Sequence, residues 1–151
     1  MEVSTAIDIN AKPQQVWAAI SNIEQAAEMI SAIKSITVLE QPTTGIVGLK
    51  WSETRVMFGK EATEVMWITE AQEPNYYQTC AQSHGSIYIS RLTIDSTPEG
   101  SRLTFSFTGQ PQTWLAKILS MLMKPLIRKS MIQALNNDLA DIKHFVENIE
   151  S

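Results

Sequence analysis

The side chains best able to do chemistry lie close together in the stretch WSETRVMFGKEATEVMWI, which spans residues 51 to 68. Glu53, Arg55 and Glu64 stand there among tryptophan, methionine and branched side chains of the kind that form a core. A carboxyl group in an apolar cavity can have a raised pKa and can exchange a proton with a ligand. An adjacent guanidinium opposes that shift, so a Glu64–Arg55 pair is better suited to orienting the polar group of a ligand than to proton transfer.

The pair Gly59-Lys60 predicts the hairpin that would bring these charges together. Glycine at the first position of a two-residue turn tolerates a positive φ, and this turn would place Phe58 opposite Glu61. The other opposed pairs are then Trp51 with Ile68, Glu53 with Met66, Arg55 with Glu64 and Met57 with Ala62. These eight residues share one face of the hairpin, because alternate side chains of a strand point to the same side.

Two interpretations of the Arg55–Glu64 pair remain open at this stage. Burying both charges in a dry core carries a large desolvation cost for each ion, so their apolar face would be the wall of a water-containing cavity. Alternatively, the pair lies near a strand end and forms a solvent-screened bridge worth below ~1 kcal/mol.

A second hairpin supports the cavity interpretation independently. If its turn is the segment STPEGS, residues 96 to 101, Ile94 lies opposite Leu103. The pairs that follow are Leu92 with Phe105, Ser90 with Phe107 and Tyr88 with Gly109. This face changes from apolar near the turn to partly polar at the other end, as expected where a core opens into a pocket with orienting hydroxyls. The alternative is that the Tyr88 hydroxyl only donates to the backbone at a sheet edge.

Residues 112 to 149 have helical spacing almost throughout, with Pro125 as the expected kink. One apolar stripe runs along this helix and comprises Ile127, Met131, Ala134, Leu135, Leu139, Ile142, Phe145, Val146 and Ile149. Asp138 lies within the stripe, where a carboxylate needs a partner or water, and Arg55 is a candidate partner. A small rotation of the helix would instead leave Asp138 on a solvated flank.

No known catalytic or metal-binding motif occurs in the chain. Cys80 lies in a predicted strand with no histidine near it in sequence, His84 lies at a predicted turn, and His144 projects away from the apolar stripe. These residues do not form a metal site, and no phosphate-binding or dinucleotide-binding loop is present. We therefore expect no metal and no cofactor.

Composition predicts one domain over residues 1–151, because this is an ordinary length for a single core. The formal net charge of -4 and the pI near 5.2 disfavour nucleic acid as a partner. With one cysteine and no signal-like amino terminus, the chain is expected to be cytoplasmic. The apolar segment WLAKILSMLMKPLI contains two lysines and a proline and is shorter than the roughly 20 residues of a bilayer span, so we expect no stable membrane insertion.

The predicted elements are one strand, two short helices, about six consecutive strands and one long carboxy-terminal helix. Consecutive strands favour antiparallel pairing, and one face of such a sheet must be buried against the long helix. The predicted fold class is therefore α+β.

This order of elements resembles the polyketide cyclase/dehydrase and lipid-transport family of the START-like (SRPBCC), helix-grip superfamily. The resemblance rests on INAKPQQVWAAISNIEQ, GLKWSETRVMFGKEATEVMWITEAQEP, SHG and GSRLTFSF in this order and spacing, and it covers nearly the whole chain. It implies a seven-stranded antiparallel sheet wrapped around the long helix, with a hydrophobic ligand cavity between them. It does not fix the chemistry, because family members include binders, carriers and cyclases.

We expect the chain to bind a small hydrophobic or lipid-like ligand between the sheet and the last helix. The expected ligand-binding residues are Trp51, Glu53, Arg55, Glu64, Met66, Ile68, Tyr88, Ser90, Phe105, Phe107, Met131, Leu135 and Asp138. One alternative is a cyclase- or dehydratase-like enzyme that uses Glu64 as the base while Arg55 and Tyr88 polarise a carbonyl. Another is an interaction module in which residues 114–129 dock on a protein partner or a membrane surface. Whether a reaction is catalysed stays open.

Overall fold

The computed structural model describes residues 2–57, 59–83, 86–111 and 113–149. Its elements are β1 (Glu2–Ile9), α1 (Pro13–Ile20), the 3-10 turn η1 (Ile23–Gln25), α2 (Ala26–Met29), β2 (Ile33–Glu40), β3 (Lys50–Met57), β4 (Lys60–Gln72), β5 (Tyr76–Ser83), β6 (Ser86–Thr97), β7 (Gly100–Pro111) and α3 (Trp114–Asn148). The predicted order of elements is confirmed, including the two short helices between the first two strands.

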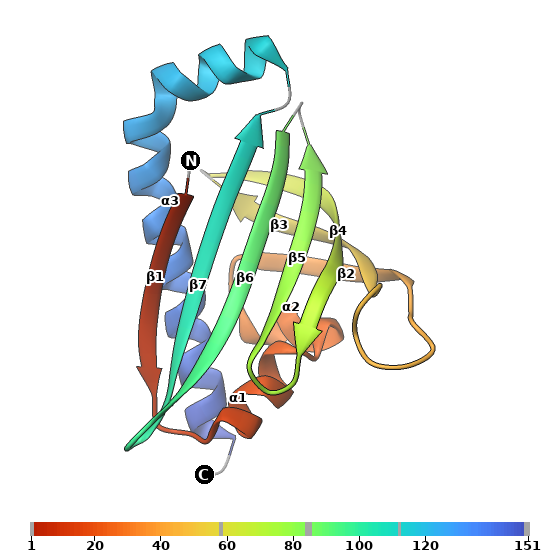
Figure 1. Ribbon diagram of the computed structural model, residues 1–151, viewed down its shortest axis with the longest axis vertical. Helices are drawn as coiled ribbons and strands as arrows, with labels where there is room; N and C mark the ends of the chain where they lie inside the picture. The colour runs from red at the N-terminus through yellow and green to blue at the C-terminus, as the bar shows by residue number, and fades with distance from the viewer. Residues whose placement is uncertain (1, 58, 84–85, 112, 150–151) are drawn as a thin grey trace.

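The strands form one antiparallel sheet in the order β1-β7-β6-β5-β4-β3-β2. The sheet curves around α3, which packs chiefly against β1 and β7, while α1 and α2 close the end at which α3 finishes (Figure 1). This is the helix-grip arrangement that the family resemblance implied. It leaves the inner face of β3 and β4 across from α3, where a site can form.

Helix α3 changes direction along its length. Its first turns run across the top of the sheet, and the remainder runs down beside β1 (Figure 1). Pro125 lies inside the helix, and proline removes one backbone hydrogen bond and clashes with the preceding turn, which accounts for the predicted kink. The predicted start at residue 112 lies outside the described residues, and Ile149, predicted to continue the apolar stripe, follows the last helical residue and is exposed.

The core lies between the carboxy-terminal part of α3, the sheet and α1. Its most deeply buried large side chains are Ile9, Ile20, Ile68, Leu103, Leu139 and Ile142. Burying an isoleucine or leucine side chain of this kind contributes roughly 1.5–3 kcal/mol. The residues of the predicted apolar stripe from Met131 to Val146 are thereby anchored against the sheet, which fixes the rotation of α3.

The β6–β7 hairpin has the predicted register. Ile94 lies opposite Leu103, and Tyr88 lies opposite Gly109. The strands continue further than predicted, because Thr97 still pairs with Gly100 and only two residues connect them.

The pairing register of the β3–β4 hairpin differs from the predicted register by two residues. Met57 lies opposite Lys60, so Gly59, with φ of +77°, is the second residue of the turn and not the first. Phe58, predicted to face Glu61, lies outside the described residues, and Glu61 pairs with Val56. A two-residue shift keeps every side chain on the same face, so the hydrophobic pattern could not distinguish the two registers.

The register correction changes which charges face each other. Glu64 lies opposite Glu53, and Arg55 lies opposite Ala62, so the predicted cross-strand pairing of Arg55 with Glu64 is wrong. The three charged residues still share the inner face.

Gly100 is the first residue of β7. The backbone of Ile9, at the end of β1, and of Ala11, in the loop that follows, passes close to it. Its φ is +153°, and a Cβ added there would lie 2.5 Å from the Ile9 carbonyl oxygen and 2.8 Å from the Ala11 nitrogen. Both contacts are to backbone, which cannot rotate away as a side chain would.

Replacing Gly100 with alanine should lower the free energy of unfolding by about 2 kcal/mol or more, because backbone strain and a steric clash act together. Gly45→Ala is the matched control, since Gly45 also has a positive φ, +65°, but nothing lies within 4 Å of the added Cβ. It should cost about 1 kcal/mol. Urea unfolding measures the stability of both variants. Equal losses in the free energy of unfolding would contradict the close approach of the Ile9 and Ala11 backbone to Gly100.

Candidate functional site

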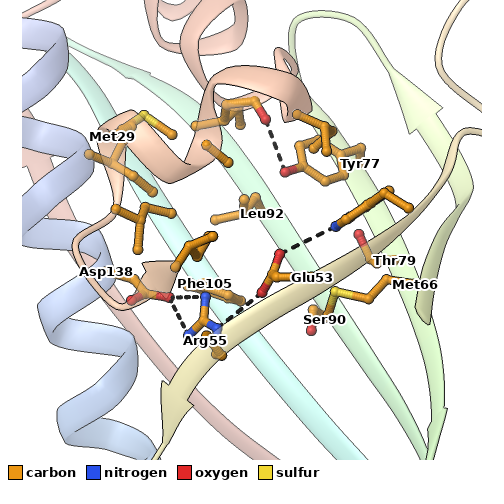
Figure 2. Close-up of a pocket in the computed structure, with 17 residues that line it drawn as sticks. Met29, Glu53, Arg55, Met66, Tyr77, Thr79, Ser90, Leu92, Phe105 and Asp138 are labelled. Atoms are coloured by element: carbon orange, nitrogen blue, oxygen red, sulfur yellow. Dashed lines mark hydrogen bonds and ion pairs between the residues drawn. The ribbon is translucent and has the colours of Figure 1, made fainter. Parts of the chain in front are cut away.

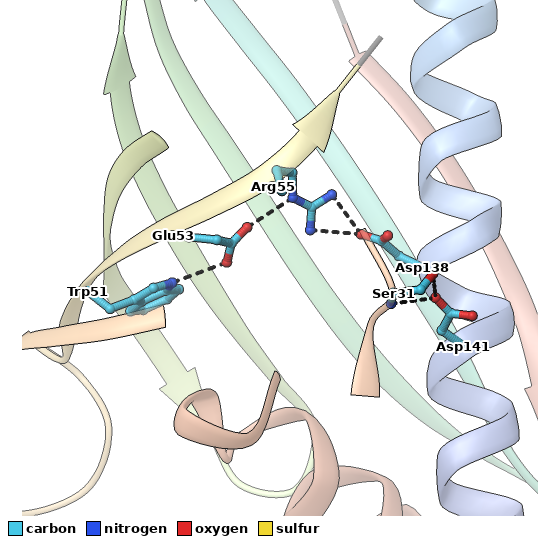
Figure 3. Close-up of polar contacts among 6 residues, drawn as sticks. All are labelled: Ser31, Trp51, Glu53, Arg55, Asp138 and Asp141. Carbon is cyan, nitrogen blue, oxygen red and sulfur yellow. Dashed lines mark hydrogen bonds and ion pairs between the residues drawn. The ribbon is translucent and has the colours of Figure 1, made fainter. Parts of the chain in front are cut away.

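Arg55 connects the sheet to the long helix. Its Nε donates a hydrogen bond of 3.0 Å to Glu53 Oε2, and its two terminal nitrogens each donate one of 3.1 Å to Asp138 Oδ2. Glu53 stands two residues earlier on β3, whereas Asp138 comes from α3 (Figure 3). The guanidinium therefore bridges two carboxylates from elements that are far apart in sequence, and we call these three residues the charged triad.

The charged triad is largely shielded from water. The side chains of Asp138 and Glu53 are 3 % and 9 % exposed, and that of Arg55 is 20 % exposed. The interpretation of Arg55 as part of a solvent-screened surface bridge is therefore wrong. Arg55 instead pairs with Asp138 on α3, as the position of Asp138 within the apolar stripe had suggested.

Electrostatics within the triad follow from this burial. Burial alone would lower the pKa of Arg55, but the charges of Asp138 and Glu53 outweigh it and raise that pKa. Burial raises the pKa of Asp138, and the charge of Arg55 opposes part of the rise. Folding thus favours proton uptake by Asp138, so its contribution to stability decreases as the pH rises above the ordinary aspartate pKa of 3.8.

Further hydrogen bonds hold Glu53 and the segment beside Asp138. The indole nitrogen of Trp51 donates to Glu53 Oε1 at 3.3 Å, which leaves each Glu53 oxygen with a donor. One turn along α3, Asp141 Oδ2 accepts from the Ser31 backbone nitrogen at 2.9 Å and from its hydroxyl at 2.8 Å (Figure 3). The segment between α2 and β2 is thereby tied to α3 beside Asp138.

Two pockets meet at the charged triad. The α3 pocket has a volume of about 270 Å³ and is lined by Glu53, Arg55, Ala62, Glu64, Met66, Tyr88, Ser90, Phe105, Phe107, Ile127, Met131, Ala134, Leu135 and Asp138. The α2 pocket, of about 90 Å³, is lined by Ile20, Ile23, Ala26, Met29, Ile30, Ile33, Trp51, Glu53, Arg55, Met66, Tyr77, Thr79, Ser90, Leu92, Phe105, Asp138 and Ile142 (Figure 2). All three triad residues line both pockets.

Most of the predicted ligand-binding residues line the α3 pocket. Trp51 lines the α2 pocket alone, and Ile68, which is 1 % exposed, is packed in the core and lines neither. The aromatic ring of Tyr88 stacks on Phe107 at 5.5 Å between centroids, which fixes one wall. Whether these residues contact a ligand remains a prediction.

Sequence reasoning missed most of the α2 pocket. Tyr77 and Thr79 are buried on β5, and the Tyr77 hydroxyl donates to the Ile20 carbonyl oxygen at 3.1 Å. Burial raises the pKa of Tyr77, and the charge of Glu53 adds to the rise. The alternation of Tyr77, Thr79 and Ala81 signals an inward face of β5, but the contact of Tyr77 with Ile20 of α1 depends on tertiary packing.

Cys80 and His144 line neither the α3 pocket nor the α2 pocket. Among the described residues, no group of three or more histidine, cysteine, aspartate or glutamate side chains is arranged to hold a metal ion. Cys80 is half-buried on β5, where burial raises the pKa of its thiol. His84 lies outside the described residues, and His144 is on the exposed side of α3.

The sequence matches the model of one protein family, described as polyketide cyclase/dehydrase and lipid transport, over residues 1–142. No curated protein sequence matches the chain. The family match agrees with the resemblance seen in the sequence.

Solved structures with low sequence identity share the fold. The protein TTHA0849 from Thermus thermophilus has a TM-score of 0.82 at 18 % identity, with all of both chains covered. A START superfamily protein from Mycobacterium smegmatis has a TM-score of 0.82 at 15 % identity, with 98 % of each chain covered. The di-domain ARO/CYC StfQ from the steffimycin biosynthetic pathway has a TM-score of 0.79 at 11 % identity, covering 97 % of this chain and 50 % of that one.

Replacing Arg55 with methionine should lower the free energy of unfolding by about 3–5 kcal/mol, because it leaves two buried carboxylates without their shared cation. Asp138→Asn added to Arg55→Met should recover part of the loss, so a double-mutant cycle should give a coupling of about 1–3 kcal/mol. Denaturant unfolding of the four proteins measures it.

The Arg102–Asp8 pair is the matched control for this cycle. Its side chains are 56 % and 65 % exposed, and Arg102 Nε lies 2.8 Å from Asp8 Oδ1. The cycle of Arg102→Met and Asp8→Asn should give a clearly smaller coupling. Similar coupling energies for the two pairs would mean that burial does not strengthen the interaction between Arg55 and Asp138.

Proposed function

The chain belongs to the polyketide cyclase/dehydrase and lipid transport family, and from that premise we propose that it binds a small hydrophobic molecule carrying a polar group in the α3 pocket. The composition of the pocket wall is the observation that carries the proposal. Aliphatic and aromatic side chains make up most of it, and a few polar groups converge beside Arg55. Such a wall is typical of sites that solvate an apolar body and orient one polar group.

The alternative function is acid–base catalysis on a ligand held in the same pocket. The placement of Glu64 and Tyr88 in one wall favours it. Arg55 favours it less, because three of its five N–H groups already donate to Glu53 and Asp138. A substrate carbonyl that accepts from one of the other two N–H groups would share the positive charge of Arg55 with two buried carboxylates, which weakens its polarisation, so binding is the function that we prefer.

A separate observation favours a docking role for residues 114–129, which we call the α3 arm. Trp114 and Met121 are 73 % and 77 % exposed, and Ile118 is exposed between them. Their spacing of four and three residues places them on one face of the helix. An exposed apolar stripe of this kind marks an interaction surface.

Charge identifies the occupant that we propose for the α3 arm, a membrane surface with anionic lipids. The sequence has no acidic residue between Glu99 and Asp138, whereas Lys117, Arg128 and Lys129 are exposed on the arm. Basic residues beside an apolar stripe with tryptophan are typical of helices that lie in the membrane interface. A second copy docked through the same face would bring these cations together.

The arm is also continuous with the α3 pocket, whose lining begins at Ile127. In the described part of the chain, no helix is long and apolar enough to cross a membrane. The docking that we propose is therefore peripheral, and it would place a membrane surface near the pocket.

Replacing Ala134 with phenylalanine should weaken the binding of octan-1-ol by roughly tenfold or more, because the added ring occupies the α3 pocket. Ala140→Phe is the matched control, since Ala140 is exposed on the same helix. Isothermal titration calorimetry measures both. Equal affinity of the two variants would place the ligand outside this pocket.

Replacing Ile118 and Met121 with glutamate should weaken binding to phosphatidylcholine vesicles that contain phosphatidylserine by roughly tenfold or more, because it adds negative charge to the apolar stripe. Leu39→Glu, at an exposed apolar residue of β2, should leave binding unchanged. Vesicle co-sedimentation measures the effect. Absence of wild-type binding, or self-association that depends on Ile118 and Met121, would contradict the membrane as occupant.

A further inference from the structure

Two hydroxyl side chains lie side by side on the inner face of the sheet, where the α2 pocket meets the α3 pocket. Thr79 of β5 and Ser90 of β6 are direct cross-strand partners (Figure 2). Such partners point to the same side of a sheet, with Cβ atoms roughly 4.5–5.5 Å apart. Thr79 lines the α2 pocket, and Ser90 lines both pockets. A ligand that extends through both pockets would therefore pass these two hydroxyls.

The Thr79 hydroxyl is buried and yet open to the α2 pocket. Thr79 is 6 % exposed, and neither its hydroxyl nor that of Ser90 is hydrogen-bonded to any described residue. In the same part of the chain, no fully enclosed side-chain nitrogen or oxygen lacks a hydrogen-bond partner. The Thr79 hydroxyl must therefore face the space of the pocket that it lines. A buried hydroxyl without a partner is costly, so this one needs water or a ligand there.

Arg55 adds hydrogen-bond donors at the same boundary. A guanidinium has five N–H groups. Three of those of Arg55 donate to Glu53 and Asp138, which leaves two that these carboxylates do not use. Arg55 lines both pockets. Because hydroxyls donate and accept, Thr79 and Ser90 together with Arg55 suit a ligand group that carries hydroxyl or carbonyl oxygens.

The size of the α2 pocket limits the group that can reach the two hydroxyls. Its volume of about 90 Å³ corresponds to roughly three water molecules, at about 30 Å³ each in the liquid. The α3 pocket, of about 270 Å³, extends along the helix to Ile127. The larger pocket therefore suits an apolar chain, and the smaller one suits a compact polar end.

We infer that the α2 pocket is a polar subsite that binds a compact, oxygen-bearing end of the ligand through the hydroxyls of Thr79 and Ser90. The apolar chain then lies in the α3 pocket. This inference rests on the proposed function and adds the orientation and class of the ligand. Its ligands are chains that end in two adjacent oxygen-bearing groups, such as 1,2-diols. A sugar ring is larger than three water molecules, so glycolipids are poor ligands.

The test compares three probes with the same eight-carbon chain, which are octan-1-ol, octane-1,2-diol and octyl glucoside, by isothermal titration calorimetry. The diol should bind about threefold or more tightly than octan-1-ol, because its second hydroxyl gains a protein partner. The glucoside should bind at least about tenfold more weakly than the diol. If none of the three binds, the proposed function fails. If the glucoside binds as tightly as the diol, or the diol no more tightly than octan-1-ol, this inference is overturned and the proposed function stands.

Thr79→Val locates the subsite, because it removes the hydroxyl and keeps the shape of the side chain. It should bring the ratio of diol to octan-1-ol affinity close to one while circular dichroism stays unchanged, and Ser90→Ala should narrow the same ratio. Thr93→Val is the matched control, since Thr93 is half-buried on β6 between Leu92 and Ile94 and therefore faces the opposite side of the sheet. Equal ratios in Thr79→Val and Thr93→Val would mean that the two hydroxyls hold only water and would overturn the subsite.

Discussion

Placing charges between a sheet and a helix is the constraint on which the rest of this structure depends. Each buried ion loses its hydration, and only close contact with an opposite charge and satisfied hydrogen bonds offset that loss. Arg55 meets this requirement by reaching Glu53 on its own strand and Asp138 on α3. The helix cannot rotate or slide without separating these groups, so the triad adds a directional restraint to the apolar packing of α3.

The same restraint bears on the two pockets that meet at the triad. Met29 and Tyr77 lie on one side of the triad, and Phe107 and Met131 lie on the other. The triad stands between them and cannot be covered by close-packed aliphatic side chains without a further desolvation cost. The space beside it stays partly open, and polar and apolar side chains line it together.

The fold was predictable from sequence because its signals are local and agree with one another. Alternating apolar residues, turn residues and the helical stripe specify the order of elements, and the β6–β7 register followed from its turn. The β3–β4 register did not, since Gly59 fits either position of a two-residue turn and a shift of two residues preserves the inner face.

The candidate site was predictable to a lesser extent. Asp138 stood out as a carboxylate in an apolar stripe, and it does pair with Arg55. Glu64 was assigned to Arg55 only because of the mistaken register. The α2 pocket depends on how the short helices pack over β5, and no periodicity within one segment encodes that packing.

The length of α3 has a geometric consequence for its own surface. At about 1.5 Å per residue, the 35 residues of α3 would extend roughly 50 Å. The strand against which it packs, β1, has eight residues and extends roughly 27 Å at about 3.4 Å per residue. Almost half of the helix therefore overhangs the strand that supports it. Pro125 falls within this overhang, and the turns before it bend across the top of the sheet. The exposure of Trp114 and Met121 thus follows from a mismatch of lengths between two packed elements.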